Sequence, residues 1–214
     1  MSRHHPKNTT LAEYAAGTLD EGRSLVVTAH LALCRQCNEF VSALEAVGGQ
    51  LLEQVEPVAM AEGAAAQALS RLPPEPATLR EASNELATPI WRSEQDTLLG
   101  YDLGPWRWIS PGLHYRAVRL PTDGDTRVFM LKAVPGLKLP AHRHTGTELT
   151  CVLSGSFIHE DGRYGAGDCD DADQDDGHSP VIDEGEDCVC LVAMQGHIKM
   201  TGLLGRLIQP FIRI

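Results

Sequence analysis

Over the first 70 residues, apolar side chains recur every three or four positions, which is the period of helices that bury one face. The first such segment, TLAEYAAG, has Gly17 at a suitable end. The next begins at TLDEG, where Thr18 and Glu21 have the spacing of a capping box and Asp20 is a rival cap. The pattern therefore predicts short helices in this part of the chain.

A seven-residue repeat continues through the second helical segment. Val26, Leu33 and Phe40 lie seven positions apart, and Leu44 falls on the same side. We expect these four side chains to pack internally. A further alanine-rich stretch, PVAMAEGAAAQALSRL, predicts another helix with Pro57 in its first turn.

The composition and the apolar period both change in the middle of the chain. LPPEPATLREASNELATP is rich in proline and poor in large apolar residues, which indicates a linker. Beyond it, HYRAVRL, RVFMLKAV, ELTCVLSGSFI and DCVCLVAM are short apolar runs separated by Gly, Pro and Asp turns, as in antiparallel sandwiches or barrels. The sequence thus predicts an α + β chain of two domains, with a helical bundle over 1–72, a linker over 73–95 and a β domain over 96–214.

Composition and charge narrow the range of functions. With 43% hydrophobic residues in 214, the chain can bury an ordinary core, and its net charge of -11 argues against direct nucleic-acid binding. No apolar run is long enough for a membrane span and the N-terminus has no signal-peptide core, so we expect a cytoplasmic protein. Six cysteines in that reducing compartment favour metal ligands, sensors or buried thiols over disulfides.

HLALCRQC brings His30, Cys34 and Cys37 close together in sequence. On one continuous helix they would lie within an arc of about 60°, and a helix break would still leave them near each other. A redox pair or simple packing is an alternative, but the added histidine favours a metal. A structural zinc site needs four ligands, so the fourth must come from elsewhere, with His4 and His5 as candidates.

A second group of metal-binding residue types lies in the predicted β domain. His142 and His144 are two apart, so on a strand both side chains face the same way. Glu148 follows within reach of a turn, and His178 is a candidate fourth ligand from a neighbouring strand. Imidazole and carboxylate suit Zn, Fe, Mn, Ni or Cu, so the sequence leaves the metal open. The alternative is a set of surface histidines.

Two further features have weaker chemical implications. The acidic stretch DCDDADQDDGH begins with the alternation of a calcium loop, but Asp176 and Ile182 occupy positions where such a loop needs Gly and Glu. We therefore predict a solvated acidic loop. Cys188 and Cys190 would face the same side of a strand, where buried thiols are favoured over an oxidant sensor, and Cys151 and Cys169 are weaker sensor candidates.

Together, these patterns carry a family resemblance. His-x3-Cys-x2-Cys behind an N-terminal histidine pair resembles the zinc-binding anti-sigma domain, and the resemblance assigns the fourth ligand to His5. GLKLPAHRHTGTELTCVLSG fits the first cupin motif completely, whereas the second motif has Gly165 in place of proline and an insert before His178. A helical zinc domain followed by a cupin resembles the ChrR family of anti-sigma factors. This resemblance covers nearly the whole chain.

The resemblance implies a function. A member of this family would sequester a sigma factor of the extracytoplasmic-function type from RNA polymerase in a one-to-one complex, and release it in response to singlet oxygen or a related oxidant. It implies two zinc sites, the helical one and the cupin one, with the cupin needed for the response. The alternative function is a metal-dependent cupin dioxygenase, for which the sequence offers ligands but no evident acid or base.

Overall fold

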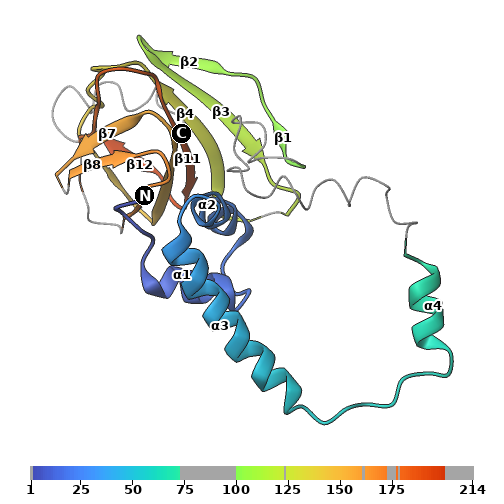
Figure 1. Cartoon of the computed structure of the whole chain (residues 1–214). Helices are drawn as coiled ribbons and strands as arrows, with labels where there is room; N and C mark the ends of the chain where they lie inside the picture. The colour runs from blue at the N-terminus through green and yellow to red at the C-terminus, as the bar shows by residue number, and fades with distance from the viewer. Residues whose placement is uncertain are drawn as a thin grey trace.

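The computed structural model describes residues 2–72, 100–122, 124–160, 162–172, 177 and 179–200. The linker predicted over 73–95 and the candidate ligand His178 lie outside the described residues. The chain places helices first and antiparallel strands after them, as the apolar periods predict (Figure 1).

The described helices all lie in the first 72 residues. They are α1 (Asn8–Ala15), α2 (Glu21–Leu31), α3 (Arg35–Glu53) and α4 (Ala64–Ser70). Asp20 caps α2, because its side chain accepts a hydrogen bond from the Arg23 N–H at 3.1 Å. The last helix begins later than predicted, at Ala64 rather than near Pro57. It follows Gly63, whose φ of +76° is a conformation that glycine adopts without strain.

The seven-residue repeat does not form one buried stripe. Val26 on α2 is fully buried, whereas Phe40 on α3 is 38% exposed. The expectation that they pack together is wrong because the chain leaves the helix between Leu31 and Arg35, so α3 starts in a new direction. The buried contact of α3 is made by Val41 instead.

Within the described ranges, the strands form three antiparallel sheets. The largest has the order β1-β3-β4-β11-β6-β9, with β2 on β3; the others are β10-β7-β8 and β12-β5. The strands are β1 (Asp102–Leu103), β2 (Arg107–Ser110), β3 (Leu113–Arg119), β4 (Arg127–Ala133), β5 (His142–His144), β6 (Glu148–Ser154), β7 (Ser156–His159), β8 (Gly162–Gly165), β9 (Cys169–Ala172), β10 (Val181–Ile182), β11 (Cys188–Met194) and β12 (Ile198–Met200).

Strand β11 at the centre of the large sheet is buried on both faces. Its alternate residues Val189 and Leu191 belong to a hydrophobic cluster that also contains α2 residues, while Cys190 and Val192 belong to a second cluster inside the β structure. Since successive side chains of a strand point to opposite faces, the sheet separates the two clusters. The helices and the large sheet therefore share one hydrophobic cluster.

Helix α2 packs closely on the chain around the start of β4. A Cβ atom at Gly22 would lie 2.7 Å from Thr126 Cγ2 and 2.9 Å from Val128 Cγ2, closer than carbon atoms pack. Only glycine therefore lets the first turn of α2 approach the sheet this closely.

This contact gives a test of stability. Gly22→Ala is expected to lower the free energy of unfolding by about 1–3 kcal/mol, because the added methyl overpacks the contact. Gly48→Ala is the matched control: a Cβ there has open space on α3, so the change should stabilise the chain by about 0.5–1 kcal/mol. Urea unfolding of both variants measures the change in the free energy of unfolding. Equal changes would show that α2 is not closely packed against β4 at Gly22.

The acidic stretch after Gly167 is not a solvated loop throughout. Residues 169–172 form β9, which pairs with β6, and residues 173–176 lie outside the described residues. The prediction is wrong for β9 because it rested on the charge of the acidic residues, and one of these residues has hydrogen-bond partners elsewhere in the chain. Asp171 has specific partners there, accepting from the Lys7 N–H at 3.0 Å and from Thr10 Oγ1 at 2.8 Å.

Candidate metal sites

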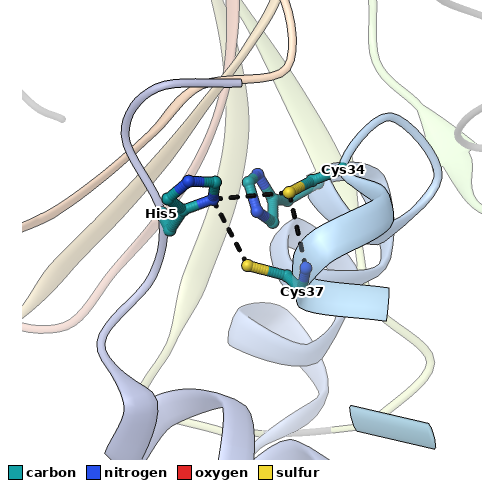
Figure 2. A group of neighbouring side chains, drawn as sticks. His5, Cys34 and Cys37 are labelled. Atoms are coloured by element: carbon teal, nitrogen blue, oxygen red, sulfur yellow. Dashed lines mark hydrogen bonds between the residues drawn. The ribbon is translucent and has the colours of Figure 1, made fainter. Parts of the chain in front are cut away.

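The first site candidate gathers the residues predicted from the N-terminal half. The ligand atoms of His5, His30, Cys34 and Cys37 all lie within 4.8 Å of one another. His5 Nδ1 is 3.3 Å from both sulfur atoms (Figure 2). His4 points elsewhere, since its ring stacks on another aromatic side chain with centroids 3.8 Å apart. The structure thus places His5, rather than His4, beside the two cysteines.

The break between α2 and α3 builds this cluster. His30 lies in the last turn of α2 and is fully buried. Cys34 is the N-cap of α3, and its Sγ accepts a hydrogen bond from the Cys37 N–H at 3.5 Å. The two cysteines therefore start one helix while the histidine ends the previous one. His5 completes the group from the N-terminal segment before α1 (Figure 2).

The histidine on α2 is oriented through its second ring nitrogen. His30 Nδ1 lies 2.7 Å from the carbonyl oxygen of Gly167. Because a carbonyl only accepts, Nδ1 carries the hydrogen and the lone pair is on Nε2. Nε2 is buried and has no hydrogen-bond partner among the described residues. An imidazole held this way is typical of a metal ligand.

The acid–base properties of the cluster agree with metal binding. Burial lowers the pKa of His30, which favours the neutral ring that a metal requires. Burial, with the contact to Cys34, raises the pKa of the Cys37 thiol to about 12, so a thiolate here needs a nearby cation. Two imidazoles and two thiols are a donor set of structural zinc. The residues present therefore fit zinc.

The second site candidate lies on β5 and β6. His144 Nδ1 is 3.2 Å from Glu148 Oε2, and the rings of His142 and His144 meet edge to face with centroids 5.1 Å apart. His142 Nδ1 is 2.8 Å from the Pro140 carbonyl oxygen, which leaves Nε2 as the donor atom of that ring for a metal. The structure therefore places His144 beside Glu148 and the ring of His142 beside that of His144, but among the described residues only the first cluster has all its ligand atoms within 4.8 Å of one another. His178 lies outside the described residues.

His142 and Glu148 border a cavity inside the β structure. The cavity has a volume of ≈ 130 Å³, and its wall is largely apolar with one polar corner. Thr150 donates to Glu148 Oε1 at 3.1 Å, and burial raises the pKa of Glu148 to about 7. The polar corner comprises His142, Glu148, Thr150 and Asp170.

Asp170 is a corner residue that the sequence patterns did not reveal, because they assigned it to a loop. The alternation of β9 is the signal that identifies it: Asp170 faces the cavity, opposite Thr150 on β6. Its neighbour Cys169 is opposite Cys151 and belongs to the cluster shared with the helices. The four cysteines of the β structure are free and buried, with Cys188 and Cys190 Sγ atoms 3.7 Å apart.

Comparison with known proteins assigns the chain to a family. A family model described as the ChrR cupin-like domain matches residues 94–198. The anti-sigma-E factor ChrR of Cereibacter sphaeroides is 41% identical over 215 residues, which cover 99% of each chain. This chain belongs to the ChrR family. The cupin-like character predicted for the β structure of this ChrR-family chain is thereby confirmed.

A solved structure of a ChrR protein supports the same assignment. The crystal structure of Rhodobacter sphaeroides SigE in complex with the anti-sigma ChrR matches with a TM-score of 0.73 and 40% identity, covering 91% of this chain and 100% of that chain. The ChrR-family fold is therefore helices followed by a cupin-like β structure. Among the described residues, no helix combines the length and the apolar character that a membrane crossing requires.

Proposed function

We propose that this chain is a cytoplasmic anti-sigma factor that sequesters a sigma factor of the extracytoplasmic-function type in a one-to-one complex. The support is the likeness over almost the whole chain to a named anti-sigma factor, and to a ChrR chain solved with SigE. The same likeness favours a regulator over an enzyme. In this proposal residues 1–72 form the inhibitory domain, 73–95 the linker and 96–214 the cupin.

The observation that carries the proposal is an exposed apolar stripe on α3. Phe40, Leu44, Val47 and Leu51 recur at helical spacing, within an arc of about 60°. Phe40, Val47 and Leu51 are 38%, 59% and 61% exposed. A contiguous apolar surface of this kind marks an interaction site, and a stripe along a helix suits packing against a helix of the partner.

The segment that follows also lacks an intramolecular partner surface among the described residues. Helix α4 contains no buried residue and stands away from the other helices and the sheets (Figure 1). Large apolar side chains along this segment are exposed, including Val58, Met60 and Leu69. Seven-residue helices of this kind are marginal alone in water. Two apolar elements separated by an extended segment suit a clamp around a folded partner.

The metal sites would serve this clamp in different ways. Zinc held by His5, His30, Cys34 and Cys37 would cross-link the N-terminal segment, α2 and α3, whose small core is otherwise marginal. The cupin site would use His142, His144, Glu148 and His178, with zinc as the expected metal. The cupin cavity would take part in the response to singlet oxygen or a related oxidant, after which the sigma factor is released.

Binding and transcription assays test this function. The zinc-loaded full chain is mixed with each extracytoplasmic-function sigma factor of its host and analysed by size-exclusion chromatography. We expect a one-to-one complex with one of them and inhibition of transcription from its promoter. Illumination with a photosensitiser in oxygen, but not under argon, should release the sigma factor. A chain that binds none of these sigma factors would refute the proposal.

A further inference from the structure

The backbone on either side of His5 is held by hydrogen bonds to the cupin, while the His5 ring contacts the helical cluster. Asp168 Oδ1 accepts hydrogen bonds from the backbone N–H groups of Arg3 at 2.6 Å and His4 at 3.2 Å. The Cys169 N–H donates to the His4 carbonyl oxygen at 3.1 Å. These contacts fix the backbone immediately before His5 against the turn between β8 and β9.

Asp168 is itself firmly placed. The residue is 5% exposed, and its Oδ2 accepts from the Gly165 N–H at 2.9 Å. Backbone hydrogen bonds join the turn to β6: the Gly167 N–H donates to the Val152 carbonyl at 2.8 Å, and the Val152 N–H to the Asp168 carbonyl at 3.0 Å. The carboxylate that holds the N-terminal segment therefore lies on a turn that is hydrogen-bonded to β6 of the large sheet.

The same turn contacts a second residue of the cluster. The Gly167 carbonyl is the oxygen that orients His30. A Cβ atom at Gly167 would lie 3.1 Å from both Leu33 Cβ and Ser2 Oγ, and the φ of +88° at this position also favours glycine. One turn of the cupin thus contacts both histidines of the helical cluster. It binds the backbone just before His5, and it accepts a hydrogen bond from the ring of His30.

A third contact secures the far side of the segment. Asp171 Oδ2 accepts from the Lys7 N–H and from Thr10 Oγ1, so β9 also holds the residues that lead into α1. Asp168 and Asp171 therefore anchor the backbone on both sides of His5. A chain terminus free of such anchors would lose conformational entropy each time His5 joined the cluster.

We infer that the cupin segment Gly165–Asp171 positions the two histidine ligands of the helical metal site. Asp168 is the residue that positions His5. The inference rests on the proposed function, because it takes the helical cluster to hold zinc. It goes further in making zinc retention by the inhibitory helices depend on the state of the cupin. Loosening this segment would free His5 from the cluster, since Asp168 and Asp171, which anchor the backbone on both sides of His5, both belong to it.

Cobalt substitution of the full chain tests this dependence. Thiolate-to-cobalt charge-transfer absorption reports a site with cysteine ligands, so a cobalt ion held by the candidate cupin ligands His142, His144, Glu148 and His178 does not contribute to it. Excess chelator is added and the decay of this absorption is followed. We expect Asp168→Ala to lose cobalt 10–100-fold faster than the wild type, as when an outer partner of a metal ligand is removed.

Two further variants separate positioning from general stability. Asp168→Asn should lose cobalt at a rate between those of the wild type and Asp168→Ala, because its amide oxygen can still accept from Arg3 and His4 while its NH2 group cannot accept from the Gly165 N–H. Ile182→Ala removes a buried side chain from the second cluster, away from the helices, and should destabilise the chain while keeping the wild-type rate of cobalt loss. Thermal unfolding of all variants establishes that Ile182→Ala is destabilised at least as much as Asp168→Ala.

The outcomes distinguish this inference from the proposed function. If the wild type shows thiolate–cobalt absorption and Asp168→Ala loses it at the wild-type rate, the inference is wrong and the zinc site stands. The inference is also wrong if Ile182→Ala loses cobalt as fast as Asp168→Ala. If the wild type never shows the absorption, both the helical zinc site and the inference fail.

Discussion

Cys34→Ser is expected to remove zinc from the helical cluster and to abolish sigma-factor binding in the same variant. Cys34 offers one of the four candidate ligand atoms. Serine can still cap α3 at this position, but its hydroxyl replaces the thiolate that would bind zinc, so the change removes the proposed metal link from α3 to α2 and His5. The loss of zinc affinity should exceed the 10–100-fold effect of removing an outer partner. Metal analysis of the purified full chain, followed by a sigma-factor binding assay, measures both losses.

Cys188→Ser is the matched control for this experiment. It makes the same chemical change at a buried cysteine on β11, away from the helical cluster. This variant should keep the helical zinc and bind the sigma factor as the wild type does. A Cys34→Ser chain that lacks zinc but still inhibits transcription would show that the metal is not needed to present α3.

Val47→Asp should weaken sigma-factor binding about 100-fold, within the range of interface hot spots. The change places a charge in the middle of the α3 stripe, where a partner helix would bury it. Since Val47 is 59% exposed in the chain alone, the free energy of unfolding should change by no more than about 0.5 kcal/mol. Titration of the labelled sigma factor and urea unfolding give the two values.

Ser42→Asp provides the comparison on the same helix. Ser42 is exposed and lies about 200° around α3 from Phe40, so it faces away from the stripe. It adds the same charge and should leave the affinity within twofold of the wild type. Equal losses in both variants would point to a general effect of negative charge on α3 rather than to the stripe.

Local patterns were sufficient to predict much of this fold. The four short apolar runs of the second half correspond to strands β3, β4, β6–β7 and β11, because such runs bounded by Gly, Pro and Asp turns are typical of strands. The spacing of His30, Cys34 and Cys37 indicated a cluster whether or not the helix continued. What the spacing left open was the break between α2 and α3, which decides that Phe40 faces solvent.

Long-range contacts were beyond the sequence. Asp168 and Asp171 belong to an acidic stretch, and nothing near them in sequence indicates that backbone N–H groups from residues 3–7 satisfy their carboxylates. For the same reason Asp170 was missed as a cavity residue. Its role depends on β9 pairing with β6, a pairing set by the whole sheet.

The hydrophobic cluster that α2 shares with the large sheet also determines whether the helices and the cupin can be produced as separate fragments. One face of the large sheet, including Met130, Leu149 and Leu191, is buried with α2 residues in that cluster. A cupin fragment expressed without the helices would present this face to water as an extended apolar surface, and such surfaces drive aggregation. Helices and cupin of this chain therefore have to be produced together for the cupin to stay soluble.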